Sequence, residues 1–264
     1  MPDPSGLGRR ASSNDFRALD SPLPLDRGEQ VSLPALVMLH LAPGVFGGLV
    51  YIALAAPVLS YGYPPIAVLL LAIGIVTLPA EIGMLIYAHR RGDTLFVYRD
   101  PIATRHWLWI VPTLLGLAVA ASALLMGTDN AIAKVLFGWA PEWYLKPLDL
   151  DAVRQYPTKS LAVTATAYLI LNGIVGPVVE EFYFRGWLLP RMSRYGRWAP
   201  VISTTLFSIY HVWSPWQFLS RVVAVAPYVY AVWRRRNVFL GVTVHVLLNT
   251  VGSLLLVGSI ASRL

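Results

Sequence analysis

Two adjacent carboxylates, Glu180 and Glu181, interrupt the apolar stretch Asn172–Arg191, and Arg185 follows four residues after the second of them. Ionisable side chains are costly to bury among apolar ones, and the cost is larger still in lipid. On a helix, Glu181 and Arg185 share one face, whereas Glu180 points about 100° away from that face. We therefore expect Glu181 to pair with Arg185 and stay anionic, which leaves Glu180 free to act as a base. The alternative is a charge cluster at a helix end, level with the lipid headgroups.

Three polar residues in two later apolar stretches could complete a catalytic set with Glu180. His211 follows Phe207 by one helical turn, and Asn249 follows His245 by one turn. Counted from the cytoplasmic end of each predicted helix, these groups lie at similar depths of roughly 13 to 18 Å. A glutamate beside an imidazole can activate water, and a second imidazole with an amide can stabilise an oxyanion. These residue types suit hydrolysis, although a lone histidine is often a packing residue and a polar pair can simply join helices.

The composition is that of a membrane protein. Hydrophobic residues make up 56% of the 264 residues and charged residues only 13%, against about a quarter charged residues in soluble domains. The chain has no cysteine, which excludes disulfides, thiolate catalysis and cysteine-ligated metals. The net charge of +7 comes from arginines clustered between apolar stretches, which is typical of cytoplasmic loops. We therefore predict an integral, multi-pass membrane protein that contacts the lipid bilayer and no nucleic acid.

Long apolar stretches predict an all-α fold, a polytopic transmembrane bundle of seven or eight helices. Several of them reach the roughly 20 residues that cross a bilayer, whereas the fifth and sixth are shorter. We expect residues 31–264 to form one transmembrane domain and the polar residues 1–30 to form a disordered cytoplasmic tail. The stretches are Leu33–Leu59, Pro65–His89, Trp107–Met126, Leu161–Leu189, Ala199–Trp213, Phe218–Trp233 and Val238–Ile260.

The distribution of arginine predicts the orientation in the membrane. Arginine clusters follow the second, fourth and sixth stretches, whereas the other loops carry little or mixed charge. The positive-inside rule then places these clusters and the N-terminus in the cytoplasm, and the C-terminus outside. The short connection Ser214–Gln217 and the long loop Gly127–Ser160 would both lie outside. The apolar, aromatic piece Ala131–Trp143 of the long loop could form an eighth short helix.

Three spaced motifs together resemble those of the CPBP intramembrane proteases, which include type II CAAX prenyl endopeptidases and bacterial Abi proteins. The resemblance covers about residues 161–260, which we expect to be the catalytic core. It implies a helical membrane fold with an intramembrane cavity open to the cytoplasm. The motifs are Glu180-Glu181-x-x-x-Arg185, Phe207-x-x-x-His211 and His245-x-x-x-Asn249.

The resemblance also implies a reaction, the hydrolysis of a peptide bond near a substrate C-terminus or within the membrane, as in CAAX-type processing. The substrate would be a membrane-associated or prenylated peptide or protein, and no cofactor would be required. Nothing in the motifs selects prenylated substrates. The roles implied by position are water activation by Glu180 and His211, an oxyanion site of His245 and Asn249, and support of the first glutamate by Glu181 and Arg185.

Alternatives to this assignment stay open. Zinc is one, because Glu180, His211 and His245 could supply three ligands and leave a fourth position for water. A non-catalytic peptide-binding or immunity membrane protein of the same fold is another. A proton-coupled transporter is a third, but transporters often carry internal repeats, and this sequence has none.

Two further ionisable residues lie within apolar stretches. Glu81 follows a proline in the second stretch, and Arg221 lies in the sixth. Intramembrane ionisable groups usually pair with one another. We expect Glu81 and Arg221 to form structural pairs, either with each other or with Glu181 and Arg185. The alternative for Arg221 is contact with a substrate carboxylate.

Overall fold

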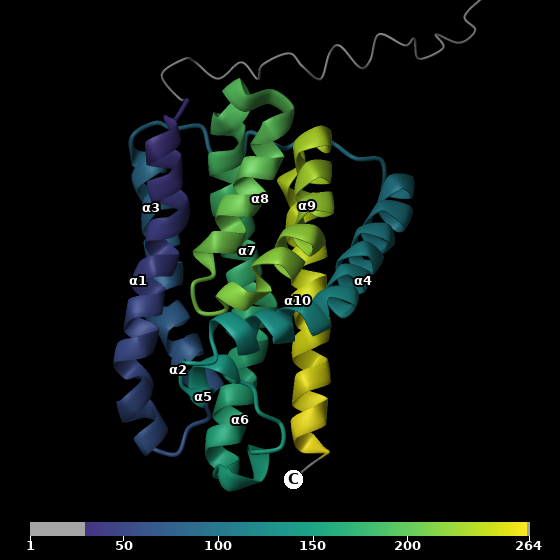
Figure 1. Cartoon of the computed structure of the whole chain (residues 1–264). Coiled ribbons are helices and arrows are strands. Elements are labelled where there is room, and N and C mark those ends of the chain that lie inside the picture. Colours follow the sequence, from purple (N-terminus) through teal and green to yellow (C-terminus); the bar gives the residue numbers. More distant parts are fainter. Residues whose placement is uncertain (1–29, 263–264) are drawn as a thin grey trace, which may run out of the picture.

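Helices make up all the regular structure of this protein. The structure, a computed structural model, describes residues 30–262, and no strand occurs in that range (Figure 1). The predicted all-α fold is therefore confirmed, whereas the expected disordered tail lies outside the described residues except for Gln30. In chain order the elements are α1 (Leu33–Ser60), α2 (Pro65–Ala72), the π-helical η3 (Ile73–Thr77), α3 (Leu78–Arg90), α4 (Thr104–Leu136), α5 (Glu142–Leu145), the 3-10 turn η4 (Val153–Gln155), α6 (Thr158–Ala167), the π-helical η5 (Tyr168–Val175), α7 (Gly176–Glu180), the π-helical η6 (Glu181–Leu188), the 3-10 stretch η7 (Leu189–Trp198), α8 (Ala199–Tyr210), the 3-10 turn η8 (Pro215–Gln217), α9 (Phe218–Arg235) and α10 (Val238–Ala261).

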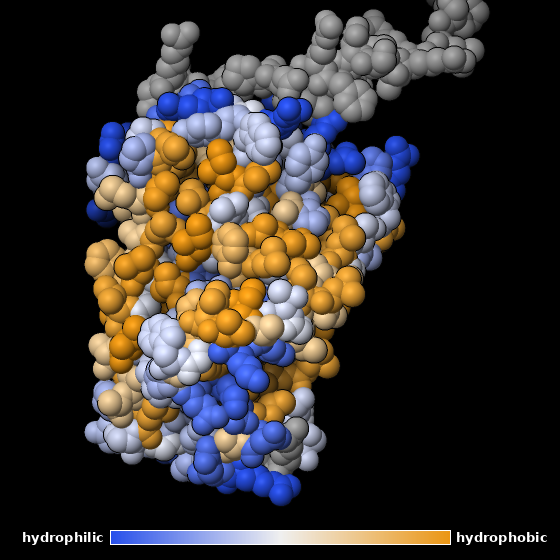
Figure 2. Space-filling view, viewed as in Figure 1, coloured by the Kyte–Doolittle hydropathy of each residue, from blue (hydrophilic) through white to orange (hydrophobic). Residues whose placement is uncertain are grey.

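The outer surface of the bundle carries a broad apolar belt. Large hydrophobic side chains such as Met38, Leu108 and Leu124 are 70%, 76% and 82% exposed. Figure 2 shows the belt between hydrophilic regions at the two ends of the molecule. A surface this apolar is unfavourable in water and favourable in lipid. The protein is therefore an integral, multi-pass membrane protein.

Five helical segments are long and apolar enough to cross a membrane, and they account for six of the seven predicted stretches. The fourth segment contains two stretches, because the chain breaks helical geometry at Gly196, where φ is 50° and ψ is −128°. The sixth stretch forms α9, which is not among the five. With α8 and α9 counted separately, the described residues form seven helices, in agreement with the prediction of seven or eight. The five segments are Leu33–Ser60, Pro65–Arg90, Thr104–Leu136, Thr158–Tyr210 and Val238–Ala261.

α8 and α9 form a hairpin within the depth of the bundle. α8 has 12 residues and is therefore about 18 Å long, whereas the hydrocarbon core of a bilayer is about 30 Å thick. Figure 1 shows that the connection between the two helices lies beside the middle of α10, far from the end where the C-terminus lies. Ser214–Gln217, which we expected to be an outer loop, thus lies at mid-depth.

The long loop after the third stretch is shorter than predicted, because α4 continues to Leu136 and not only to Met126. In Figure 1 the C-terminal part of α4 crosses the bundle toward α5. It is held there by Asp129, which accepts a hydrogen bond of 2.6 Å from the Ser220 hydroxyl of α9. Between Phe137 and Pro157 the described chain forms only the single turns α5 and η4. The piece Ala131–Trp143, which could have formed an eighth short helix, is instead divided between the end of α4 and the start of the single turn α5.

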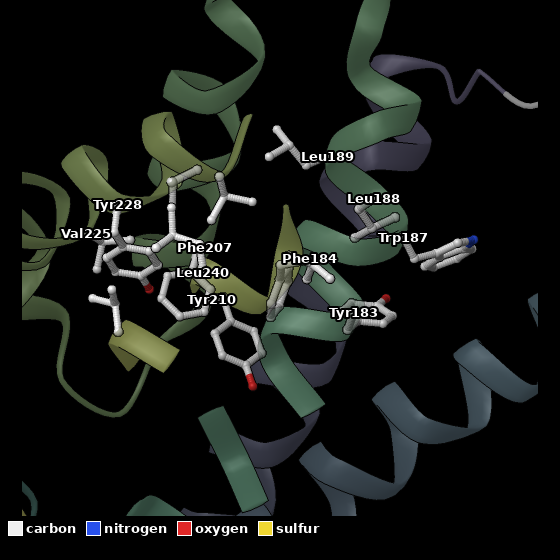
Figure 3. Packing of buried hydrophobic residues seen from close by; sticks show 14 of the residues in the cluster. Tyr183, Phe184, Trp187, Leu188, Leu189, Phe207, Tyr210, Val225, Tyr228 and Leu240 are labelled. Carbon is white, nitrogen blue, oxygen red and sulfur yellow. The ribbon is translucent and has the colours of Figure 1, made fainter. Parts of the chain in front are cut away.

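We expected a cavity open to the arginine-rich end of the bundle. Within the bundle, Phe184 and Phe207 are fully buried, and their ring centroids lie 5.1 Å apart (Figure 3). An apolar cleft of about 480 Å³ lies elsewhere, between α2, α6 and η5, where Leu70 and Leu171 line it. The cytoplasm-facing cavity therefore stays a prediction.

α1 supports the end of α8 through backbone contact. A Cβ atom at Gly44 would overlap the carbonyl oxygen of Tyr210, and one at Gly48 would overlap the side chain of Val212. These two residues flank His211. The small residues of α1 thus fix the position at which α8 ends.

We expect Gly44→Ala to destabilise the protein by about 1–3 kcal/mol, because the added methyl group forces α1 away from Tyr210. Gly116→Ala is the matched control, since Gly116 also lies in a long helix but has open space at its Cβ position. The control should be neutral or slightly stabilising, as alanine is the better helix former. Thermal unfolding of both variants in one detergent measures the difference. Equal melting temperatures would contradict the proposed packing of α1.

The absence of cysteine allows a clean test of the predicted orientation. Single cysteines replacing Arg194 or Arg235 lie at the arginine-rich end, and one replacing Lys159 lies near the opposite end; all three positions are exposed. In intact cells, a membrane-impermeant maleimide should label Lys159→Cys and leave Arg194→Cys and Arg235→Cys unlabelled until the cells are lysed. The reverse pattern would place the N-terminus outside.

Candidate active site

The two adjacent glutamates lie at a change in helix geometry. Glu180 is the last residue of α7, and Glu181 is the first residue of the π-helical η6. A second π-helical segment, η5, precedes α7. Widened turns of this kind are frequent at functional sites, because they redirect side chains within a continuous helix. The apolar pattern of the sequence predicted the helix but not these turns.

Glu181 is fully buried and binds three partners. Its Oε1 lies 3.3 Å from the Arg185 guanidinium, which is the ion pair predicted from their spacing. The same oxygen accepts hydrogen bonds from His245 Nδ1 at 3.0 Å and from the Tyr228 hydroxyl at 3.2 Å. One carboxylate thus connects η6, α9 and α10. We expected Glu181 and Arg185 to support Glu180, whereas the direct contacts of Glu181 are to His245.

The Arg185 side chain is also fully buried. Its guanidinium carbon lies 4.1 Å from the ring centroid of Phe207 and 5.6 Å from that of Tyr228. Such cation–π contacts partly replace the water that a buried guanidinium has lost. Phe207, which belongs to the second motif, therefore provides the aromatic surface against which Arg185 packs.

Glu180 faces His245. The distance from Glu180 Oε2 to His245 Nε2 is 3.9 Å, and the Glu180 side chain keeps 14% of its surface exposed. Because Nδ1 of His245 donates to the Glu181 carboxylate, Nε2 is the ring nitrogen that Glu180 meets. The separation is longer than a direct hydrogen bond, so these two groups can share a small polar guest.

His211 lies just past the end of α8, beside the same aromatic cluster. Its Nδ1 lies 2.8 Å from the carbonyl oxygen of Phe207. A carbonyl can only accept, so Nδ1 carries the proton and a neutral ring leaves Nε2 as an acceptor. The centroids of the His211 and Phe207 rings lie 4.7 Å apart, and those of His245 and Phe207 lie 6.2 Å apart. The two imidazoles thus flank one phenyl ring, but no direct hydrogen bond joins His211 to Glu180 among residues 30–262.

Asn249 lies one turn after His245 and contacts the main chain of η5. Its Nδ2 donates to the carbonyl oxygen of Asn172 at 3.0 Å, and the neighbouring Thr250 donates to that of Gly173 at 2.9 Å. These bonds fasten α10 to the π-helical segment. The second hydrogen on Asn249 Nδ2 is still available, and the predicted oxyanion role stays a prediction.

Two tyrosines that the sequence reading did not single out belong to this region. Tyr228 binds Glu181 as described. The Tyr210 hydroxyl donates to Glu81 Oε1 at 2.7 Å and lies 3.5 Å from Glu180 Oε1. Glu81 therefore pairs with a tyrosine, and the expected pairs with Arg221 or with Glu181 and Arg185 are not formed. The sequence offered one signal for Tyr210, which is its position directly before His211.

The alternative zinc set does not fit this arrangement. Among residues 30–262, no group of three His, Asp or Glu side chains lies close enough together to hold a metal ion. Glu180 and His245 approach each other, but His211 has no contact with Glu180.

The buried pair of Glu181 and Arg185 makes a stability prediction. We expect Glu181→Gln to destabilise the protein by about 3–5 kcal/mol, because it leaves a buried guanidinium without its counter-charge. Adding Arg185→Met to that variant should recover part of the loss. The matched control is Glu142→Gln, which breaks an exposed pair of the same spacing with Lys146 and should change little. Thermal unfolding in detergent measures all three, and additive losses in the double variant would contradict the pairing.

Comparisons with known proteins agree with the motif assignment. Residues 162–251 match the family model described as type II CAAX prenyl endopeptidase Rce1-like. No curated protein and no solved structure matches the chain. The matched residues run from α6 to α10 and include all three motifs. Residues 162–251 are thus similar to the Rce1-like type II CAAX prenyl endopeptidase family, in agreement with the resemblance drawn from the motifs.

Proposed function

We propose that this protein is an intramembrane endopeptidase that hydrolyses a peptide bond of a membrane-associated substrate by CAAX-type processing. The family match supports a protease. The observation that carries the chemistry is the approach of Glu180 to His245, with 3.9 Å between Oε2 and Nε2 inside a membrane protein. Carboxylate and imidazole at that spacing suit a reaction that moves protons to and from a bound water.

Glu180 is the proposed base. It removes a proton from water while the water oxygen attacks the scissile carbonyl carbon. The carbon–nitrogen bond then breaks, and the leaving amine takes the proton back from the Glu180 carboxyl group. His211 accepts a hydrogen bond from the water through Nε2, because its Nδ1 is bonded to the Phe207 carbonyl. The products are one new carboxylate and one new amine, so atoms and protons balance.

His245 and Asn249 are the proposed donors to the oxyanion. Because His245 Nδ1 already donates to Glu181, the ring can offer a second N–H only as an imidazolium. The buried Glu181 carboxylate orients the ring through Nδ1, in the way that a carboxylate orients a catalytic histidine elsewhere. The free hydrogen on Asn249 Nδ2 is the second donor.

The substrate we propose is a prenylated or otherwise membrane-anchored peptide. The family name supports a prenylated C-terminal sequence. The apolar belt of the bundle supports a substrate that arrives within the bilayer, since an isoprenoid chain partitions there. A non-catalytic protein that binds such a peptide without cutting it is the rival function, and it would need the same fold and the same apolar surface.

Glu180→Gln tests the proposal. The change is isosteric and removes the base, so cleavage of a prenylated CAAX peptide should fall by at least about 100-fold. Glu142→Gln, which removes an exposed carboxylate paired with Lys146, should cut at the wild-type rate. An unbiased comparison of membrane-protein fragments in cells with the wild type and Glu180→Gln would identify natural substrates. Peptide binding without turnover in the wild type would favour the rival function.

A further inference from the structure

Arg221 on the first turn of α9 donates hydrogen bonds only to neutral groups among the described residues. Its guanidinium donates to the Ser214 hydroxyl at 2.7 Å, to the Gln217 amide oxygen at 3.1 Å and to the Ser208 carbonyl at 3.4 Å. The expected pair with Glu81 is not formed, because Glu81 binds Tyr210. Among the described residues no carboxylate forms an ion pair with Arg221.

This environment differs from that of the other arginines inside the bundle. Arg185 lies 3.3 Å from Glu181, and Arg191 lies 3.4 Å from Asp93. A guanidinium at membrane depth is costly without a counter-charge, and such residues are usually paired or functional. Three neutral acceptors satisfy some of the N–H groups of Arg221, whereas the nearest carboxylates, Glu180 and Asp129, act on it without forming an ion pair. The position is therefore suited to an anion that arrives from elsewhere.

The guanidinium of Arg221 also lies beside the candidate active site. Ser208 precedes His211 by three residues and Ser214 follows it by three, so Arg221 contacts both sides of the turn that carries this histidine. The charge of Arg221 acts on Glu180 and on His211. Arg221, Glu180 and His211 are each half-buried, so none of the three is fully enclosed by the protein.

We infer that Arg221 binds the free C-terminal carboxylate of the peptide substrate and so limits cleavage to bonds a few residues before a chain end. This inference rests on the proposed function. A guanidinium can hold a carboxylate through two parallel hydrogen bonds, which suits recognition of a chain end. A CAAX sequence ends in such a carboxylate close to its prenylated cysteine. An extended chain advances about 3.3–3.6 Å per residue, so a few residues can connect the neighbouring groups.

Two peptides test the subsite without any change to the protein. They are the same farnesylated CAAX peptide with a free C-terminal carboxylate and with a C-terminal carboxamide. Wild-type protein should cut the carboxylate peptide with a kcat/KM about 10- to 100-fold higher, which corresponds to one charged hydrogen-bonded contact. Equal kcat/KM values would overturn the inference while leaving the proposed function intact.

Substitution of Arg221 separates recognition from a structural role. Arg221→Gln should lower kcat/KM for the carboxylate peptide to the value for the carboxamide peptide and leave the latter within about threefold. Arg221→Lys should keep part of the preference, and Arg235→Gln, the same change at an exposed position of α9, should keep all of it. If Arg221 only holds the turn at His211, Arg221→Gln will lower kcat/KM for both peptides and leave the ratio of the two values unchanged.

Binding to the Glu180→Gln variant keeps the test independent of catalysis. Fluorescently labelled carboxylate peptide should bind this variant about 10- to 100-fold more tightly than the carboxamide peptide. Adding Arg221→Gln should abolish the difference. Discrimination in binding with no cleavage by the wild type would retain the subsite and reject the proposed function. Cleavage by the wild type with equal binding of both peptides would reject the subsite alone.

Discussion

The buried Glu181 carboxylate is the constraint on which the rest of this structure depends. Removal of a carboxylate from water costs several kcal/mol, so the fold must bring donors to it. Arg185, Tyr228 and His245 supply them from η6, α9 and α10. Gly241 on α10 leaves room for this carboxylate, since a Cβ atom there would overlap Glu181 Oε2. The same interaction therefore fixes helix packing and the orientation of the candidate catalytic imidazole.

Local rules predicted much of this arrangement. The spacing of Glu181 and Arg185 indicated their ion pair, and the apolar stretches indicated the helices. Contacts between distant segments were not accessible in the same way. Tyr210 and Tyr228 resemble ordinary core residues until the fold places a carboxylate at each hydroxyl. The π-helical turns on either side of α7 leave no mark in an apolar pattern, because that pattern is fitted by a regular helix as well.

The short hairpin of α8 and α9 explains how a histidine reaches mid-depth. Irregular backbone at membrane depth is tolerated only where the protein itself satisfies the polar groups. Here Ser214 N donates to the His211 carbonyl at 3.0 Å, and the Tyr144 hydroxyl donates to the Val212 carbonyl at 2.6 Å. α5 and the C-terminal part of α4 thus cover the turn. The fifth stretch is shorter than most of the other apolar stretches, and its length places His211 at this level.

The two interior cations of this region have different electrostatic surroundings, and that difference matters for chemistry. Arg185 forms an ion pair with Glu181 and stacks on Phe207. Arg221 forms no ion pair with a carboxylate among the described residues, and its hydrogen bonds hold both sides of the turn that carries His211. A substrate carboxylate bound at Arg221 would lie beside the turn that carries His211. The contact that recognises the chain end would then also bring the peptide to the residues that act on it, which is how binding energy serves positioning.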